Sequence, residues 1–306
     1  CEQDVVEYFV ENATNVRFER LTFDLGRWNG IEVRDSDNVL VAGCVIRRLG
    51  GTAVTIEGGR NCGVFGCELA TLGRNGTSIR GGDRRTLKAC GHYVENCHIH
   101  DFSRWDRTYT PAASVEGVGV RIAHNLIHDS PGHAMRIEGN DHIIEFNDVH
   151  HVVTETDDQG ALDMWFNPTY RGVIIRHNFW HHIGGSEPDR MRGGVRLDDA
   201  ICGVLIYGNV FWKASQGLFG GVQIHGGKEN EVANNLFVEC RYGVSFSRWG
   251  AQRWAETMAS DAVRKATRED VDITKPPFST RYPALARLVE NPDVNRIWCN
   301  VAVNCG

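Results

Sequence analysis

The sequence has no long apolar run, little lysine and no closely spaced pair of cysteines. No stretch of its 306 residues approaches the roughly 18 apolar residues that a membrane-spanning helix needs. Its ten cysteines include no CxxC pair and no cysteine–histidine pattern at zinc-binding spacing. The net charge of −6 is spread along the chain, which argues against nucleic acid and anionic membrane surfaces as partners.

Positive charge is carried mostly by arginine, because only five of the 33 basic residues are lysines. The planar guanidinium group of arginine suits paired hydrogen bonds to carboxylate or sulfate groups better than the lysine ammonium does. Composition therefore predicts a globular protein, in which 42% apolar residues can form a sizeable core. Composition does not identify a function, which depends on particular sequence motifs.

An internal repeat dominates the sequence. The segments TNVRFERLTF (14–23), DNVLVAGCVI (37–46) and RNCGVFGCEL (60–69) align without gaps, and the pattern then continues with insertions. One column of this alignment reads Leu21, Cys44, Cys67, Cys97, Asn125, Asn147, Asn178, Asn209, Asn235 and Asn300. Polar side chains stacked in successive coils can hydrogen-bond to one another, and we expect the cysteines in this column to be buried free thiols. Cys1, Cys299 and Cys305 remain able to pair.

A second short strand follows in each repeat, as in TAVTIEGG, AMRIEG and GVQIHGG. Apolar and polar residues alternate there, which is the period of a strand and not of a helix. Coils of 22–31 residues with two or three short strands predict a parallel β-helix of about ten coils. We expect the helix to be right-handed, as crossovers between parallel strands generally are.

Residues 250–292 break the repeat with the helix-like AQRWAETMASDAVRKATRED and the loop TKPPFSTRYP. We expect this segment to leave the coil stack as a helical and loop excursion and to form a wall beside the functional site. The coil pattern returns at Asn295. Residues 1–306 are expected to form a single β-helix domain, and part of a longer protein because the chain begins and ends close to coil sequence.

The repeat register predicts which side chains share a face of the second strands. The inward positions are Ile56, Ile79, Val115, Ile137, Met164, Leu197, Ile224 and Phe246. Coils stack about 4.8 Å apart, so outward side chains of successive coils should form lines. One line holds Glu138, Trp165, Asp198 and His225, and the line beside it holds Arg136, Asp163, Arg196 and Gln223. Asp157 and Asp158 lie in the turn before this patch, and Asp199 lies in the turn after it.

This patch predicts a carbohydrate site. Pairs of carboxyl groups about 5–5.5 Å or 6.5–9.5 Å apart carry out glycoside hydrolysis. Aspartates in turns more often cap the chain, but two Asp-Asp pairs bracketing a charged row favour a functional site. Crowding of the five aspartates is expected to raise the pKa of at least one of them. The expected substrate-binding residues are Glu138, Arg136, Asp163, Trp165, Arg196, His225, Arg248 and Trp249.

Several segments carry a family pattern: TETDDQGAL, TYRGVIIRHNFWHHIG, GGVRLDDAICGVLIYGNVFW, VQIHGGKENEVANNLFVEC and PPFSTRYPALARLVENP. Together they resemble right-handed parallel β-helix proteins related to glycoside hydrolase family 141, over most of the chain from residue 80 onward. The resemblance implies hydrolysis of a complex glycan, fucosylated or xylan-type. It implies a catalytic pair formed by Asp158, with Asp157, and by Asp198 or Asp199.

The segment DMWFNPTYRG departs from that family, whose members usually read Gly-Arg-Asp-Trp there and often have tyrosine at the position of Asp163. The pocket is therefore altered beside the catalytic aspartate, so the resemblance does not identify the sugar that is bound. The arginines and His225 are expected to orient sugar hydroxyls, or a sulfate or carboxylate group on the substrate.

Two other functions remain open. A polysaccharide lyase would use a base, and often Ca²⁺, which the aspartates could hold through oxygen ligands. A non-catalytic stack would bind glycans without turnover. For the hydrolase we expect no metal and no cofactor, a polysaccharide or oligosaccharide as partner, and neither nucleic acid nor membrane. We expect a secreted or periplasmic location because large glycans are met outside the cytoplasm, although no signal peptide is visible in this chain.

Overall fold

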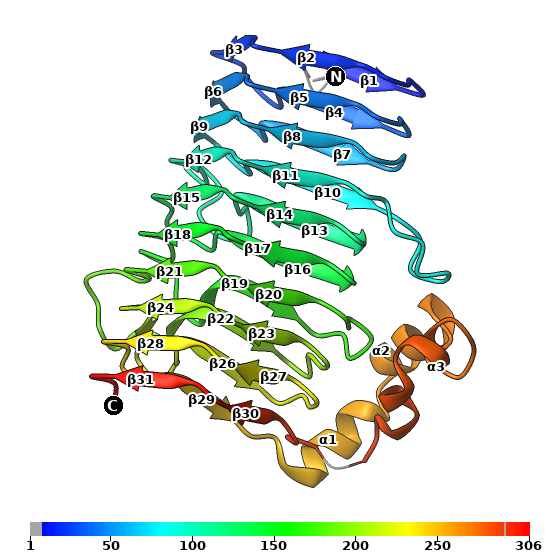
Figure 1. Cartoon of the computed structure of the whole chain (residues 1–306), viewed down its shortest axis with the longest axis vertical. Helices are drawn as coiled ribbons and strands as arrows, with labels where there is room; N and C mark the ends of the chain where they lie inside the picture. Colours follow the sequence, from blue (N-terminus) through cyan, green and yellow to red (C-terminus); the bar gives the residue numbers. More distant parts are fainter. Residues whose placement is uncertain (1–7, 291) are drawn as a thin grey trace.

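The computed structural model describes residues 8–290 and 292–306, which form a stack of coils (Figure 1). Each coil contributes one short strand to each of three parallel sheets, and each strand pairs with its counterparts in the coils before and after it. This is the predicted parallel β-helix, with ten strands along the path of each sheet and three strands in each coil. Within these residues, no helix has the length and apolar character needed to cross a membrane.

The first sheet contains β1 (Tyr8–Glu11), β4 (Ile31–Arg34), β7 (Val54–Glu57), β10 (Thr77–Gly81), β13 (Ala113–Val118), β16 (Met135–Asn140), β19 (Gln159–Trp165), β22 (Arg192–Asp198), β26 (Val222–His225) and β29 (Val244–Ser247), with β25 (Ser215–Gln216) antiparallel to β22. The second sheet contains β2 (Arg17–Glu19), β5 (Leu40–Ala42), β8 (Gly63–Phe65), β11 (Tyr93–Glu95), β14 (Arg121–Ala123), β17 (Ile143–Glu145), β20 (Ile174–Arg176), β23 (Leu205–Tyr207), β27 (Glu231–Ala233) and β30 (Arg296–Trp298). The third sheet contains β3 (Thr22–Asp24), β6 (Val45–Leu49), β9 (Glu68–Leu72), β12 (His98–His100), β15 (Leu126–His128), β18 (Asp148–His150), β21 (Phe179–His181), β24 (Val210–Trp212), β28 (Leu236–Val238) and β31 (Val301–Val303).

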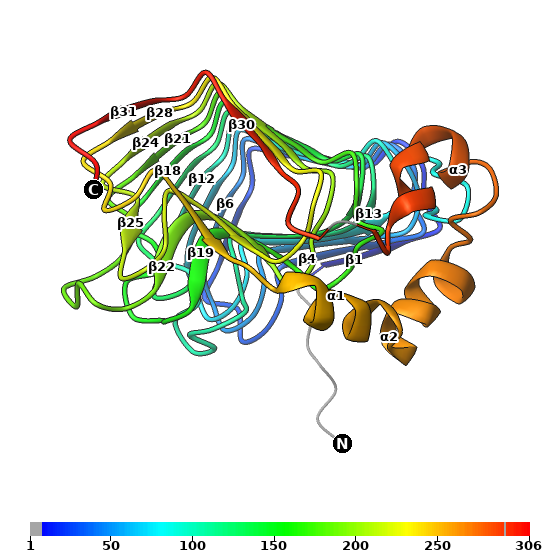
Figure 2. The same cartoon turned by 90° about the horizontal axis from the view of Figure 1, so that it is seen from below.

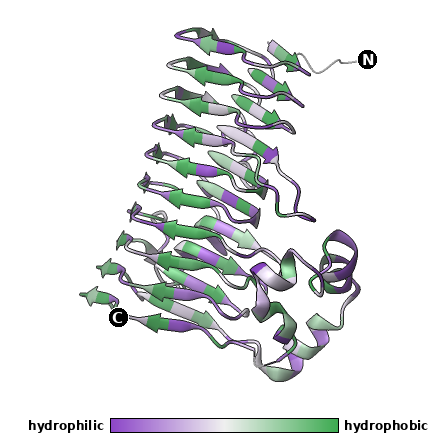
Figure 3. Ribbon diagram, turned by 45° about the vertical axis from the view of Figure 1, so that its right-hand side comes forward, coloured by the Kyte–Doolittle hydropathy of each residue, from purple (hydrophilic) through white to green (hydrophobic). Residues whose placement is uncertain are grey.

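Strand pairing confirms the predicted register of the first sheet. Leu197 pairs with Met164 and with Ile224, and all three side chains are buried in the core. Phe246 keeps its register beside Ile224, but the residue is 44% exposed, unlike the other inward positions. The reason is that β29 is the last strand of the first sheet in the described part of the chain. Figure 3 shows apolar strand segments repeated throughout the stack.

An asparagine ladder runs through the interior, as the repeat column predicted. From Asn125 to Asn235, each Nδ2 donates to the Oδ1 of the next asparagine at 2.9–3.0 Å. The same Oδ1 accepts the backbone N–H of the previous asparagine, and each Nδ2 also donates to a backbone carbonyl. Every rung therefore satisfies a buried amide group and fixes the register between two coils.

Cysteines occupy the same column in the early coils and are thiols, as expected. All nine cysteines in the described ranges are free, and the sulfur of Cys67 accepts the backbone N–H of Cys44 at 3.4 Å. A thiol is a weaker acceptor than an amide oxygen, so these rungs contribute less than those of asparagine. Cys1 lies outside the described residues.

Two buried histidines make similar contacts at the turns before second-sheet strands. Nδ1 of His142 accepts the backbone N–H of Val120 at 3.1 Å, and its Nε2 donates to the carbonyl of Glu138 at 3.1 Å. These partners require a neutral ring with its proton on Nε2. Burial lowers the pKa of His142 to about 4 and also lowers the pKa of His92, which makes the equivalent contacts with Cys62 and Gly58.

The excursion predicted at residues 250–292 lies along one edge of the stack (Figures 1 and 2). It consists of α1 (Gly250–Met258), α2 (Asp261–Arg264), the π-helix η1 (Lys265–Asp270), α3 (Phe278–Arg281) and the 3-10 helix η2 (Pro283–Arg287). Its apolar side chains form a second cluster, in which the indole Nε1 of Trp254 donates to the carbonyl of Leu288 at 3.1 Å. The Tyr282 hydroxyl anchors it to a coil by donating to the Arg171 carbonyl at 3.3 Å.

Replacing the central rung of the ladder tests its contribution to stability. Asn178→Ala removes the buried side-chain acceptor of the backbone N–H and of Nδ2 of Asn147, so we expect a loss of about 3 kcal/mol in the free energy of unfolding, measured in urea. Asn178→Cys is the matched control, because a thiol can accept weakly there, and it should cost less. Equal losses for both variants would contradict this role.

Acid should destabilise the fold partly through His142. An unfolded histidine takes up a proton near pH 6.5, whereas the folded ring resists protonation until about pH 4, so stability falls as the pH falls through this window. In His142→Asn, the free energy of unfolding should depend less steeply on pH between these values, as measured by urea unfolding at a series of pH values. The exposed His124→Asn serves as control, and an unchanged slope in His142→Asn would refute the assignment.

Candidate functional site

A cavity of about 600 Å³ opens on the first sheet over β16, β19 and β22. Its lining comprises Tyr109, Arg136, Asp157, Asp158, Gln159, Asp163, Trp165, Arg196, Asp198 and Asp199. Eight of the twelve residues predicted for the site therefore lie together, in the row order expected from the repeat: Arg136 pairs with Asp163, and Asp163 pairs with Arg196.

The buried guanidinium group of Arg196 joins two aspartates. Its Nη2 lies 2.9 Å from Asp158 Oδ1 and 3.0 Å from Asp198 Oδ1, while its Nη1 donates to the backbone carbonyl of Asp158. Because both carboxylate oxygens contact one nitrogen, they lie no more than about 6 Å apart, an upper limit that is compatible with the roughly 5–5.5 Å between the paired carboxyl groups of retaining glycosidases. The guanidinium also packs over the ring of Phe219 at 5.2 Å.

The two aspartates differ in their surroundings. Partial burial of the carboxyl group raises the pKa of Asp158, Arg196 opposes this rise, and the negative charge of Asp198 adds to it. The side chain of Asp198 is only 13% exposed, against 59% for Asp158, and its Oδ1 also accepts from Nδ1 of His225 at 2.8 Å. The prediction that one pKa is raised is thus confirmed for Asp158, although burial contributes more than crowding. Asp158 therefore retains a proton more readily than an ordinary aspartate, and the carboxylate of Asp198 contacts Arg196 and His225.

The side chain of Asp157 hydrogen-bonds to the backbone of the loop that carries Asp158. Its Oδ1 accepts the backbone N–H of Asp158 at 2.9 Å and that of Met191 at 2.7 Å, which ties the loop to the next coil. Asp158 itself has φ of 54°, a left-handed conformation that aspartate tolerates better than most residues. Asp157 therefore helps to hold Asp158 at the edge of the cavity.

Asp199 lies between three donors. Its Oδ2 accepts from Nε1 of Trp165 at 3.3 Å, while its Oδ1 lies 3.2 Å from Nδ1 of His225 and 3.6 Å from Nη2 of Arg253. Arg253 lies on α1, so the excursion reaches the site through this contact. Sequence reasoning missed Arg253 because a helix outside the repeat has no register relative to the coils.

Two aromatic rings flank Arg136 in the cavity wall. Its guanidinium carbon lies 5.7 Å from the ring centre of Tyr109 and 5.8 Å from that of Trp165. Its Nε donates to Oε1 of Glu138 at 2.6 Å, so Glu138 contacts the wall without lining the cavity. Trp165 is half-exposed and outward, as predicted. Tyr109 was missed because it lies in the irregular loop between β12 and β13.

Asp163 lies deeper and is almost fully buried. Its Oδ1 accepts the backbone N–H of Gly160 at 3.1 Å, and its Oδ2 lies 3.3 Å from Nδ1 of the buried His133. His133 was also missed, because it precedes β16 and stands outside the aligned rows. The only sequence signal for it is its place in a turn that leads onto the site.

Four of the predicted residues lie outside the cavity lining: Glu138, His225, Arg248 and Trp249. The buried Trp249 has its ring 5.7 Å from that of His225 in an edge-on arrangement, and the guanidinium carbon of Arg253 lies 4.1 Å above its ring. Nε of Arg248 lies 3.9 Å from Asp293, and its side chain is exposed. Trp249 thus packs against His225, whereas Arg248 pairs with Asp293, which does not line the cavity.

Asp198, Asp199 and His225 could also approach a metal ion, because each offers one ligand atom within 4.8 Å of the other two. The guanidinium groups of Arg196 and Arg253 already lie 3.0 and 3.6 Å from these carboxylates. Ca²⁺ takes six to eight oxygen ligands, so an imidazole and two adjacent cations do not suit it.

Comparison with known proteins supports the fold. A family model described as a right-handed beta helix region matches residues 111–256, which include the strands under the cavity. The structure is accordingly a right-handed parallel β-helix. No curated protein matches the sequence.

Three solved structures are similar to this chain at low sequence identity. A glycoside hydrolase matches with a TM-score of 0.50 and 14% identity over 78% of this chain and 40% of its own. The tailspike protein of E. coli bacteriophage HK620 in complex with a pentasaccharide matches with 0.46 and 15%, over 78% and 52%. PfbA, a surface adhesin of Streptococcus pneumoniae, matches with 0.43 and 11%, over 78% and 68%. The chain thus covers 40% of the length of the hydrolase, and at 14% identity this match shows the fold alone.

The electrostatic contrast within the cavity can be measured directly. The pKa of Asp158, followed by carboxyl-carbon NMR, should fall in Asp198→Asn, because a repelling charge is removed, and should rise in Arg196→Gln, because an attracting charge is removed. Arg253→Gln, which removes a cation beside Asp199, is the matched control and should leave the pKa of Asp158 in place. A pKa of Asp158 that does not respond to Asp198→Asn would contradict the coupling.

Proposed function

We propose that the protein is a glycoside hydrolase that cleaves a complex glycan with Asp158 and Asp198, in line with the resemblance to family 141. The observation that carries the proposal is the pair of carboxyl groups bridged by Arg196, one with a raised pKa and the other held by Arg196 and His225. A raised pKa suits a general acid near neutral pH, and a carboxylate held by donors suits the base or nucleophile.

In the proposed reaction, Asp158 gives its proton to the glycosidic oxygen as the bond from that oxygen to the anomeric carbon breaks. Asp198 assists on the other side of the sugar, either by taking a proton from the attacking water or by attacking the anomeric carbon itself. Water supplies the hydroxyl group of the new reducing end, and its remaining proton restores the acid. Asp157 and Asp199 then act as positioning residues for the reacting pair.

The wall around Arg136 supports a sugar as substrate. Tyr109 and Trp165 offer aromatic faces on which the apolar face of a pyranose can stack, and the guanidinium group between them can donate to hydroxyl oxygens. The lining has five aspartates against two arginines, which favours a neutral glycan, such as a fucosylated or xylan-type one, over a uronate-rich one. Large glycans of this kind place the protein outside the cytoplasm.

Activity assays on site variants test the proposal. The protein should release reducing ends from at least one member of a panel of fucosylated, xylan-type and uronate-rich glycans, without a gain in ultraviolet absorbance. Asp158→Asn and Asp198→Asn should each lower kcat by about 10²–10⁴-fold, because each removes one half of the acid–base pair. Asp157→Asn, the neighbour with the same change in charge, should retain more activity because its carboxylate accepts only backbone N–H groups.

Other outcomes point elsewhere. Absorbance at the wavelength of unsaturated uronates would identify a lyase and overturn hydrolysis. Glycan binding without any product, in the wild type as in the variants, would identify a binding protein. Thermal unfolding of each variant shows whether lost activity reflects chemistry or folding.

A further inference from the structure

The third sheet carries a column of imidazole rings that the proposed hydrolysis does not use. His100, His128, His150 and His181 pair in register on β12, β15, β18 and β21. Their successive ring centres are 5.2, 4.7 and 4.6 Å apart, close to the spacing of the coils. Ring stacking alone explains most of this column. At one position, however, a carboxylate also lies close to the rings.

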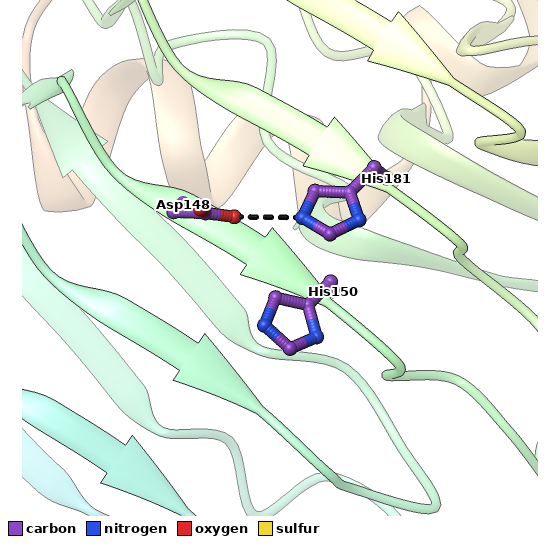
Figure 4. Close-up of side chains that lie close together, drawn as sticks. All are labelled: Asp148, His150 and His181. Atoms are coloured by element: carbon purple, nitrogen blue, oxygen red, sulfur yellow. Dashed lines mark hydrogen bonds and ion pairs between the residues drawn. The ribbon is translucent and has the colours of Figure 1, made fainter.

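At that position a carboxylate joins two of the rings. Asp148 stands two residues before His150 on β18, so both side chains leave the same face of the strand. Oδ1 of Asp148 accepts from Nε2 of His181, on the neighbouring coil, at 2.9 Å. Figure 4 shows the two rings on neighbouring strands, with one nitrogen of each ring on the side of Asp148. One ligand atom from each of the three residues lies within 4.8 Å of the others.

Two further histidines engage the opposite edges of these rings. Nδ1 of His150 lies 2.7 Å from Nδ1 of His151, and Nδ1 of His181 lies 2.9 Å from Nδ1 of His182. Two facing ring nitrogens share one proton, so each contact orients its ring. Nε2 of His150 and Nε2 of His181 are thereby left for Asp148 or for a ligand beside it. Outer partners that orient histidine ligands in this way are a regular feature of metal sites.

We infer that Asp148, His150 and His181 form a binding site for a divalent transition-metal ion such as Zn²⁺. Two imidazole nitrogens and one carboxylate oxygen, completed by water, are a ligand set that Zn²⁺ uses, whereas Mg²⁺ and Ca²⁺ favour oxygen ligands. The side chain of Asp148 is half-exposed and that of His181 is mostly buried, so an ion can enter from solvent and meet a ring held in place.

Binding of the ion would replace the hydrogen bond between Asp148 and His181 with three metal–ligand bonds. The ion takes the place of the proton between Asp148 and His181, and the three ligand atoms close around it at about 2.0–2.2 Å. Since His150 and His181 belong to adjacent coils, the ion links β18 to β21 and should stabilise the stack. This effect is independent of glycoside hydrolysis.

The rest of the column lacks such a set. Nε2 of His98 lies 2.8 Å from Nε2 of His128, but the carboxylates of Asp101 and Asp129 bind Nδ1 of the histidine that precedes each of them. Among the described residues, two clusters bring three ligand atoms together: this one and Asp198, Asp199 and His225 in the cavity. An experiment must therefore distinguish metal binding at one cluster from metal binding at the other.

Titration of the apo protein with ZnCl₂, followed by calorimetry and thermal unfolding, tests the site. The wild type should bind Zn²⁺ with a rise in its unfolding temperature, and Asp148→Asn and His181→Gln should each weaken this binding at least about tenfold. Asp148→Asn keeps the shape of the side chain and an oxygen acceptor for His181, so it separates metal binding from folding. Co²⁺ in place of Zn²⁺ should give a visible absorption spectrum that the same variants lose.

Two control variants locate the ion. His177→Gln removes an imidazole that stacks on Phe146 and belongs to neither three-ligand cluster, and it should bind Zn²⁺ as the wild type does. Asp198→Asn breaks the cluster in the cavity and should likewise keep the Zn²⁺-dependent rise in unfolding temperature. Binding that is lost in Asp198→Asn and kept in Asp148→Asn, or no binding by the wild type at all, would overturn the inference.

Discussion

The hydrogen-bonded ladder from Asn125 to Asn235 is the constraint on which the rest of the structure depends. Each rung connects the side chain and backbone of one coil to the next, so the chain cannot slip by a residue without leaving buried amide groups unpaired. Once this register is fixed, every outward position of a strand repeats vertically at the coil spacing. Residues far apart in sequence, such as Arg136, Asp163 and Arg196, then become neighbours on one surface.

In the cavity, the charged side chains on this surface need neighbours of opposite charge. A buried arginine is unfavourable unless anions and acceptors surround it, and crowded carboxylates are unfavourable unless cations lie between them. Arg196 meets both needs, since it contacts the carboxylates of Asp158 and Asp198 and the backbone carbonyl that precedes β19. His225 adds a further donor to Asp198 and rests on Trp249. The reacting pair of the proposed hydrolase and the structural support of the cavity are thus one network.

The structural features that recur with the repeat could be predicted from the sequence. The coil architecture, the asparagine column and the rows that hold Asp163 and Arg196 were predictable because a fixed period converts sequence spacing into position. Tyr109, His133 and Arg253 were not, since they lie in an irregular loop, in a turn before a strand and in a helix, where no period applies. The division of roles between Asp157 and Asp158 was also out of reach, because it depends on which carboxylate the backbone N–H groups of the loop engage.

A solenoid also limits where an excess of one charge can arise. In the early coils the outward row alternates Glu57, Arg80 and Glu116, and each carboxylate meets the intervening arginine. In the next coil Glu138 stands beside Glu116, and its carboxylate pairs instead with Arg136 of its own strand, because like charges stacked at the coil spacing repel one another. Asp158 and Asp199 avoid this limit because they lie in turns, with φ values of 54° and 42°, just before and just after strands. The turns therefore add acidity beside a balanced row, and a carboxyl group with a raised pKa belongs to a turn residue.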